Sequence, residues 1–387
     1  MSILEFLHNV IFNYTIRNVT LGAFGLGAFA GILGVFAVLR KQSLLGDAVS
    51  HSTLPGVAVA FLLIGYKNYV IFTIGAIIAG LISMAFFTLI INNTRIKSDS
   101  ALGLSLSIFF GMGLVITDFI KKLPGQAKGG LESYILGQAA TIVQEDVIGI
   151  FGFGIFSLII LLIFWKEFKL FSFDKDFCAS KGFNSKILES MLTTIIVIAI
   201  VIGLSNVGVI LMAALIVAPA TAARQWTNHL SLMAILAGLF GGLSGIIGAY
   251  VSSTYSKIPT GPTIVVAISV IVFISIIFAP NRGLLFRWLK TFKNKRRILV
   301  DTVLIDLLEY AQGHENKFAH SAPVSVLKIM THGEVGVKKS LKALEKNGMV
   351  KKLPNNEWKL TKKGFITAEK LEVLGNKRKN SQKTGEK

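Results

Sequence analysis

Two side chains that could bind a cation stand four residues apart near the start of an apolar stretch. Asp47 and His51 belong to residues 44–60, which otherwise hold mainly small and apolar side chains. On a helix this spacing puts a carboxylate and an imidazole one above the other on one face. Together they suit a first-row divalent cation such as Mn²⁺, Fe²⁺ or Zn²⁺. The same spacing also suits an intrahelical ion pair or a helix cap, and spacing alone leaves these alternatives open.

The elements that must position this pair are apolar helices. The chain has 387 residues, of which 52% are hydrophobic and 16% charged, and its mean hydropathy is +0.65. This composition is typical of a polytopic helical membrane protein and not of a soluble domain. Because an ionisable side chain at the centre of a membrane helix costs about 2.5–3.5 kcal/mol, Asp47 and His51 need a reason to be there.

Runs of about 20 apolar residues, the length that crosses a hydrocarbon layer, recur along the chain. We predict eight such spans, within a range of seven to nine, because residues 131–145 could form an amphipathic segment or part of a short span. Cys178 is the one cysteine, so helix packing and not an internal disulfide must hold the fold. The predicted spans lie near residues 19–39, 44–65, 69–91, 101–120, 146–165, 190–212, 229–251 and 262–279.

Glycines gather in two of these spans, mostly at intervals of three or four residues. Small residues at such spacing let helix backbones approach closely. We therefore predict tight helix packing at these positions and assign no transport role to any single glycine. The two groups are Gly22, Gly25, Gly27, Gly31 and Gly34, and then Gly241, Gly242, Gly245 and Gly248.

Positive charge is concentrated behind the last apolar run. Residues 281–387 contain 24 of the 40 Lys and Arg residues and 10 of the 21 Asp and Glu residues, or about +14 of the formal net charge of +19. By the positive-inside tendency this end of the chain is cytoplasmic, with Trp288 at the membrane interface. Charges in the earlier loops follow both odd-numbered and even-numbered spans, so they do not decide the upstream topology.

Four short blocks follow one another along the chain. They are Gly46-Asp47-Ala48-Val49-Ser50-His51 with Leu54-Pro55-Gly56, then residues 98–104, residues 208–224, and Ile258-Pro259-Thr260-Gly261-Pro262. In this order the blocks resemble the membrane subunits of manganese, zinc and iron ABC transporters. The resemblance covers roughly residues 15–280 and implies that Asp47 and His51 belong to the ion pathway.

The third block has a pattern of its own. An apolar helix runs into Pro219, and a turn of small residues then leads to Arg224. This pattern predicts a break and a short loop-helix outside the membrane, for which an ordinary interhelical turn is the alternative. The family resemblance implies that this element couples the helices to the ATPase. The residues assigned to it are Ala218, Pro219, Ala220 and Arg224.

The energy source must lie on another chain. The sequence contains no Gly-x-x-x-x-Gly-Lys-Ser/Thr phosphate loop, and Gly333–Ser340 departs from that pattern at Val337. The resemblance implies a separate ABC ATPase subunit, a homodimer of this chain, and an extracytoplasmic metal-binding protein that delivers the ion. We expect no permanently bound cofactor, and the transported divalent metal ion (Mn, Zn or Fe) to be the only metal involved.

The tail has the pattern of a separate domain. Apolar periodicity predicts helices near residues 299–308, 324–329 and 337–344, and residues 349–350 and 358–360 predict a two-stranded ribbon around Pro354. Another helix begins near residue 361. This order resembles the winged-helix module of metal-dependent repressors of the diphtheria-toxin-repressor type.

Four lysines give the tail a surface that would attract anions: Lys338, Lys339, Lys342 and Lys346. The segment offers few Arg, Asn or Gln side chains for base edges, so we rank a regulatory or protein-docking role above DNA binding. Anionic membrane lipid would attract the same lysines. His314, His320 and His332 have no cysteine nearby and are interpreted as solvated loop residues.

The predicted fold class is an all-α polytopic membrane protein of about eight transmembrane helices, followed by a small cytoplasmic α+β winged-helix domain. The predicted parts are an amphipathic segment (1–18), the permease domain (19–280), a basic linker (281–298), the winged-helix-like domain (299–375) and a disordered tail (376–387). The predicted location is the bacterial cytoplasmic (inner) membrane. Two alternatives remain: a membrane-anchored, metal-responsive transcription regulator, and a permease for iron chelates or a vitamin.

Overall fold

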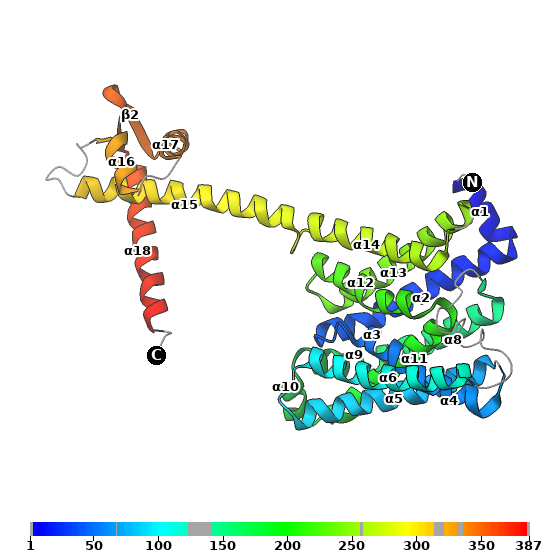
Figure 1. Cartoon of the computed structure of the whole chain (residues 1–387). Helices are drawn as coiled ribbons and strands as arrows, with labels where there is room; N and C mark the ends of the chain where they lie inside the picture. The colour runs from blue at the N-terminus through cyan, green and yellow to red at the C-terminus, as the bar shows by residue number, and fades with distance from the viewer. Residues whose placement is uncertain are drawn as a thin grey trace. The chain divides into compact units, whose positions relative to one another are not determined.

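The computed structural model describes residues 3–66, 68–122, 141–255, 258–312, 321–331 and 336–384. The chain divides into two compact units, residues 1–284 and 285–387. In Figure 1 the first unit is a bundle of helices, and the second combines helices with a small sheet. The helical membrane fold that composition predicts is therefore confirmed for the first unit. Much of residues 131–145, where the sequence allows an amphipathic segment or part of a short span, lies outside the described part.

The first unit is built mainly from long apolar helices, with a few short ones between them. Figure 1 labels most of them. They are α1 (Ile3–Phe12), α2 (Tyr14–Leu39), α3 (Leu45–Ser52), α4 (Leu54–Ile64), α5 (Tyr69–Asn93), α6 (Ser98–Lys122), α8 (Gln144–Ile163), α9 (Trp165–Phe173), α10 (Lys175–Ser180), α11 (Ser185–Val207), α12 (Val209–Trp226), α13 (Leu230–Thr254) and α14 (Thr260–Phe278).

Within the described ranges, nine helical segments are long and apolar enough to cross a membrane, with α3 and α4 together forming one of them. The predicted count of eight is one too low because residues 190–212 are not a single span. Gly208, at φ +85°, ends α11 and begins α12. Glycine adopts this backbone conformation without the steric cost that a Cβ would add. One predicted helix is therefore two.

Asparagines fix where three of the long helices begin. The Oδ1 atoms of Asn13, Asn68 and Asn184 precede α2, α5 and α11, and each accepts hydrogen bonds from two backbone N–H groups at 3.1 and 3.3 Å. These bonds satisfy donors that have no partner within the helix. The start of each span is thus set by one side chain as well as by hydropathy.

The clustered glycines pack helices together, as predicted. A Cβ on Gly27 would overlap the backbone carbonyl of Gly241, and one on Gly245 would overlap that of Ala23, so α2 and α13 cross with their backbones in contact. Gly34 meets the carbonyl of Ile216 on α12 in the same way. A methyl group at any of these three glycines would force the helices apart.

The same contacts fix helix directions. Gly25 meets Phe151 and Phe29 meets Gly154, so α2 and α8 run parallel, whereas the α2–α13 contacts show antiparallel helices. Gly248 lies against Ile264 and Ser252 bonds to Thr260, so α13 and α14 are antiparallel and α14 runs parallel to α2. Trp226 near Ser275, and Leu211 near Gly261, make α12 parallel to α14. The carboxyl ends of α2, α8, α12 and α14 therefore lie at one end of the bundle, together with α9 and α10 (Figure 1).

A buried charge network closes that end of the bundle. Arg40, just beyond α2, has a side chain only 8% exposed, and its Nη2 lies 3.3 Å from Oε1 of Glu189 on α11. Lys175 Nζ donates to the other carboxylate oxygen of Glu189 at 2.9 Å. Cys178, buried and unpaired by any disulfide, lies on α10 nearby in the chain. The network ties α2, α10 and α11 together, because a buried guanidinium needs its counter-charge.

Pro219 does not break the helix that contains it. The structure continues α12 through Pro219 to Trp226, so the predicted turn and short loop-helix are wrong. Proline removes one backbone donor, but packed neighbouring helices tolerate this in membrane proteins. Pro219 is buried, and its Cβ lies against Gly31 of α2. The chain leaves the helix only at Thr227.

The second unit follows the order helix, strand, two helices, two strands, helix. The strands pair antiparallel in the order β1-β3-β2, with Val350 opposite Leu360 and Lys352 opposite Trp358. The predicted ribbon is thus confirmed, whereas the short strand β1 was not foreseen. The elements are α15 (Leu284–Gln312), β1 (Ala322–Pro323), α16 (Val324–Met330), α17 (Val337–Lys346), β2 (Val350–Leu353), β3 (Glu357–Leu360) and α18 (Lys362–Thr384).

Two boundaries in the tail differ from expectation. The predicted basic linker, residues 281–298, is helical from Leu284 and continuous with the next predicted helix, because no Gly or Pro interrupts α15 before residue 312. The predicted disordered segment, residues 376–387, lies within α18 up to Thr384. The tail's three histidines lie outside the described residues.

Candidate metal site

The carboxylate and imidazole predicted as ligands meet on the short helix α3. Asp47 Oδ1 lies 3.4 Å from His51 Nε2, and the two side chains are 47% and 33% exposed within the chain. The pair is therefore neither buried in the helix bundle nor fully solvated. The opposite face of α3, including Leu45, Ala48 and Val49, is completely buried. Residues three or four positions apart share one face of a helix. The sequence pattern therefore predicts that Asp47 and His51 lie on one face of α3 and that Leu45, Ala48 and Val49 lie on the other.

α3 is held by a glycine next to the pair. A Cβ on Gly46 would lie 3.3 Å from the Cα of Ala213 and 3.4 Å from the Cβ of Ile216, both on α12. The backbone of α3 therefore packs directly on α12 at the residue before Asp47. A displacement of α12 would be transmitted to Asp47 through this contact, because packed helices transmit strain.

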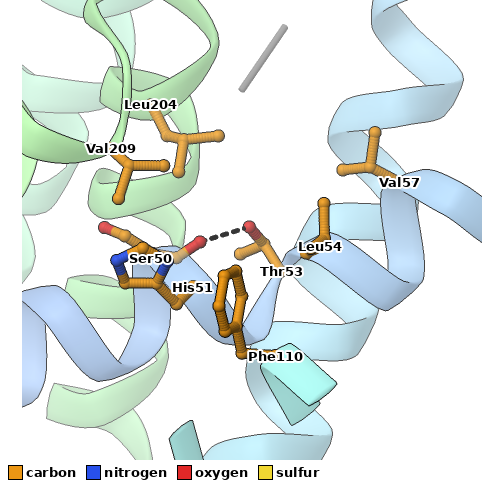
Figure 2. Close-up of a pocket in the computed structure, with 8 residues that line it drawn as sticks. All are labelled: Ser50, His51, Thr53, Leu54, Val57, Phe110, Leu204 and Val209. Atoms are coloured by element: carbon orange, nitrogen blue, oxygen red, sulfur yellow. Dashed lines mark hydrogen bonds between the residues drawn. The ribbon is translucent and has the colours of Figure 1, made fainter. Parts of the chain in front are cut away.

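His51 lines a small pocket together with residues of α3, α4, α6, α11 and α12 (Figure 2). Its ring meets that of Phe110 edge to face, with centroids 4.9 Å apart. Leu204 and Val209, on either side of the Gly208 break, form another wall. The pocket has a volume of about 20 Å³, enough for one water or one small ion.

Two further residues of the site were not singled out from the sequence. Ser50 lines the pocket, and its buried Oγ has no hydrogen-bond partner among the described residues. Its backbone carbonyl accepts a bond from Thr53 Oγ1 at 2.7 Å where α3 gives way to α4 (Figure 2). Phe110 comes from α6, 59 positions after His51, and no local pattern signals such a contact.

One chain supplies few ligands. The described part of the chain contains no group of three or more His, Cys, Asp or Glu side chains that could hold a metal ion. Structural zinc sites use four protein ligands and catalytic ones three. Asp47 and His51 can therefore contact a passing cation but do not enclose it.

The residues predicted to form the coupling element lie in the second half of α12. Ala220 is fully buried and Pro219 is buried beside it, Ala218 is partly exposed, and Arg224 is partly exposed in the last helical turn. The turn that follows is held in place: Asn281 Nδ2 donates to the Trp226 carbonyl at 2.7 Å, and Arg282 Nη2 donates to Asn228 Oδ1 at 3.1 Å. The structure thus separates a buried packing segment from an exposed end near Arg224.

The four predicted lysines share the exposed face of α17. Lys338, Lys339, Lys342 and Lys346 are at least partly exposed, while Val337, Leu341 and Leu344 on the other face are buried. Gly348, at φ +69°, follows the helix and turns the chain into β2. Lys351 and Lys352 on β2 are also exposed, which enlarges the cationic surface of the second unit.

Curated transport proteins are similar to this chain over most of its length. The zinc transport system membrane protein TroC of Treponema pallidum is 48% identical over 71% of this chain and 92% of its own length. The manganese transport system membrane protein MntC of Bacillus subtilis is 39% identical over 344 residues, 89% of this chain and 78% of its own. An alignment of that length cannot fit within residues 1–284, so it extends into the second unit.

A solved structure and a family model cover the helical unit. The structure described as PsaBC from Streptococcus pneumoniae in complex with Fab superposes with a TM-score of 0.64 at 30% identity, covering 75% of this chain and 99% of that one. A putative metal-chelate type ABC transporter in an inward-facing conformation, at 16% identity and a TM-score of 0.54, shares the fold. The model of the ABC 3 transport family matches residues 13–279. This chain belongs to the ABC 3 transport family.

Proposed function

We propose that this chain is the membrane-spanning permease subunit of an ABC importer for a divalent transition metal, manganese, zinc or iron. The observation that carries the proposal is the Asp47–His51 pair, half-exposed beside a pocket of single-ion size in a membrane-spanning segment. Ionisable side chains at such a position are costly unless an ion or a partner compensates them. The names of the relatives support manganese and zinc as cargo.

The ion pathway is completed by a second copy of this chain. One chain contributes one carboxylate and one imidazole, fewer ligands than a first-row divalent ion takes. A homodimer with the α3 helices facing each other doubles the set to two carboxylates and two imidazoles. Because the cation is cargo, the site must also release it, and ligands divided between two chains separate when the subunits move apart.

The carboxyl end of α14 faces the cytoplasm of a bacterial cell. Because α2, α8, α12 and α14 end at the same side of the bundle, basic residues that follow them share that side. The nine spans support this orientation, because Arg224 follows the seventh span and not the sixth. By the positive-inside tendency that side is cytoplasmic. The residues are Arg40, Lys41, Lys166, Lys169, Arg224 and Arg282. Lys121 and Lys122 end α6 on the other side, because the contacts of His51 with Phe110 and of Leu54 with Gly113 make α6 run parallel to α3 and α4, which lead away from the end of α2.

A separate ATPase drives the cycle, and an extracytoplasmic metal-binding protein delivers the ion. The chain has no phosphate loop of its own. We assign ATPase contact to the exposed end of α12, where Arg224 and the anchored turn lie, and signal transfer to Pro219, Ala220 and the Gly46 contact. Motion imposed on Arg224 would travel along α12 and reach Asp47 through the contact of Gly46 with α12.

Reversing the charge at the end of α12 should separate hydrolysis from transport. For Arg224→Glu we expect the assembled complex to keep hydrolysing ATP while metal uptake falls about tenfold. A change of this size lies within the range of about 5–150-fold that coupling between two sites typically produces. The measurement is ATPase activity and uptake in the same proteoliposomes. Lys181→Glu, an exposed lysine at the same end of the bundle, serves as the control. Equal loss of both activities, or of neither, contradicts the assignment.

The second unit is a winged-helix module that regulates the transporter. Its order of helices and strands, with α17 exposing lysines and β2–β3 forming a ribbon, supports this. We favour docking of an acidic protein partner over DNA, because α17 presents lysines and no Arg, Asn or Gln side chains for base edges. A membrane-anchored transcription regulator is the second candidate, and DNA binding by the second unit would favour it.

Removing the second unit should alter control and spare transport. We expect deletion of residues 299–387 to leave assembly and maximal uptake within about twofold of wild type, since each unit has its own core. Uptake is measured at low and at high external metal. The deletion should change only how strongly uptake responds to the metal concentration. The control is a full-length chain in which four lysines of α17 are changed to Glu: Lys338, Lys339, Lys342 and Lys346. It keeps the tail and separates the effect of these lysines from the effect of losing the whole unit. Failure to assemble would make the unit structural instead.

The cargo is tested directly. Cells expressing this chain with its ATPase are given radiolabelled Mn²⁺, Zn²⁺ or Fe²⁺, each in competition with the other two ions. Uptake of at least one free ion is expected. Uptake of an iron chelate or a vitamin, with none of the free ions, would favour the remaining alternative, although the 20 Å³ pocket at His51 is far smaller than such a cargo.

A further inference from the structure

A second, larger cavity opens on the side of the helical unit, away from the metal pair. Its volume is about 730 Å³, within the usual range for small-molecule sites. Ile32 of α2 lies among the walls, with Leu158, Leu161 and Leu162 of α8 and with Ala234 and Ile235 of α13. We name this cavity the lateral groove. No residue that lines it also lines the pocket at His51.

The lateral groove is apolar along its length and polar at one end. In the single chain Leu162 is 70% exposed and Ile235 58%, so in a membrane-spanning unit these apolar walls are open to an acyl chain. Its polar residues all come from the end where α8 finishes and α13 begins: Trp165, Lys166, Glu167 and Ser231. Trp165 follows the last residue of the α8 span by two positions, a depth at which tryptophan marks the membrane interface.

The polar end carries one charge of each sign. Lys166 and Glu167 both line it, and Oε2 of Glu167 is shielded from solvent with no hydrogen-bond partner among the described residues. A carboxylate with an unpaired buried oxygen is unfavourable unless a cation compensates its charge. Among the described ion pairs none joins Glu167 to the neighbouring Lys166. A ligand bearing an amine and a phosphate would match Glu167 and Lys166.

We propose that the lateral groove binds one phosphatidylethanolamine molecule, with an acyl chain along the apolar walls, its ammonium at Glu167 and its phosphate at Lys166 and Ser231. The apolar walls select a lipid, and the paired charges select a zwitterionic headgroup with N–H donors. Phosphatidylcholine matches the charges but has no N–H to donate, and phosphatidylglycerol has no cation. The site is independent of the metal pathway.

The test is native mass spectrometry of the full chain, released from vesicles of equimolar phosphatidylethanolamine, phosphatidylcholine and phosphatidylglycerol. We expect one retained phosphatidylethanolamine per chain. Glu167→Gln should lower its retention relative to phosphatidylcholine about tenfold, the scale of a lost charge-assisted hydrogen bond. Glu145→Gln, an exposed carboxylate in the first turn of α8, should change nothing.

A second variant fills the cavity. Ala234→Trp should abolish retention of all three lipids, and elution as a single symmetric peak shows that it still folds. If it does not fold, the comparison of Glu167→Gln with Glu145→Gln decides alone. Equal retention of the three lipids by wild type, or unchanged selectivity in Glu167→Gln, overturns the proposal. So does a wild-type chain that holds no lipid while Ala234→Trp turns dimers into monomers, because the groove would then be a contact between copies.

Discussion

Replacing Asp47 or His51 by alanine is expected to reduce metal uptake about 100-fold or more while the protein stays in the membrane. Loss of an outer-shell partner already costs about 10–100-fold in metal affinity, and a direct ligand should cost at least as much. With Asp47 Oδ1 and His51 Nε2 3.4 Å apart, removal of either leaves the cation one ligand per chain. The measurement is initial uptake of the radiolabelled ion, normalised to the amount of chain in the membrane.

The chain offers a close control for this prediction. Asp118 and Lys122 form another i,i+4 pair, at 2.7 Å, on the exposed side of α6. Asp118→Ala removes a carboxylate from the same kind of helical pair and should leave uptake unchanged. Asp47→Glu should retain part of the activity, because it keeps a carboxylate but moves it by one methylene. Normal uptake by both Asp47→Ala and His51→Ala would show that the pair is only an intrahelical ion pair.

Introducing a large side chain at Gly34 is expected to prevent the permease from folding. Any Cβ there overlaps the carbonyl of Ile216, so Gly34→Leu must separate α2 from α12. Overpacking a well-packed core costs about 1–3 kcal/mol even where side chains can move, and here the obstacle is backbone. We expect the yield of monodisperse protein in detergent to fall about tenfold and uptake to fall with it.

A glycine on the exposed side of α8 separates this effect from a general intolerance of leucine. A Cβ added at Gly149 would meet none of the described neighbouring atoms within 4 Å, so Gly149→Leu should fold and transport normally. Size-exclusion profiles of the two variants give the comparison. Normal profiles for both variants would mean that α2 and α12 are packed less closely than in the structure described above.

Several features of this protein follow from local sequence. Membrane-length apolar runs predict the helical bundle, and the four-residue spacing of Asp47 and His51 predicts their proximity, because both depend only on helical geometry. Glycines at three- and four-residue intervals predict close packing, and the two short runs at residues 349–350 and 358–360, on either side of Pro354, predict the ribbon. The resemblance to metal transporters also rests on short contiguous blocks, so the sequence alone carries it.

Other features depend on contacts between distant segments and emerge only from the folded chain. Gly208 ends one helix and begins another, whereas Pro219 does not end its helix. Local propensity predicts a continuous helix through Gly208 and a break at Pro219. It predicts the break because it takes no account of the packing of Pro219 against Gly31. The His51–Phe110 contact and the lateral groove join residues that no sequence spacing relates. Sequence periodicity determines which face of each helix is apolar, but the choice of neighbour depends on shape complementarity over the whole bundle.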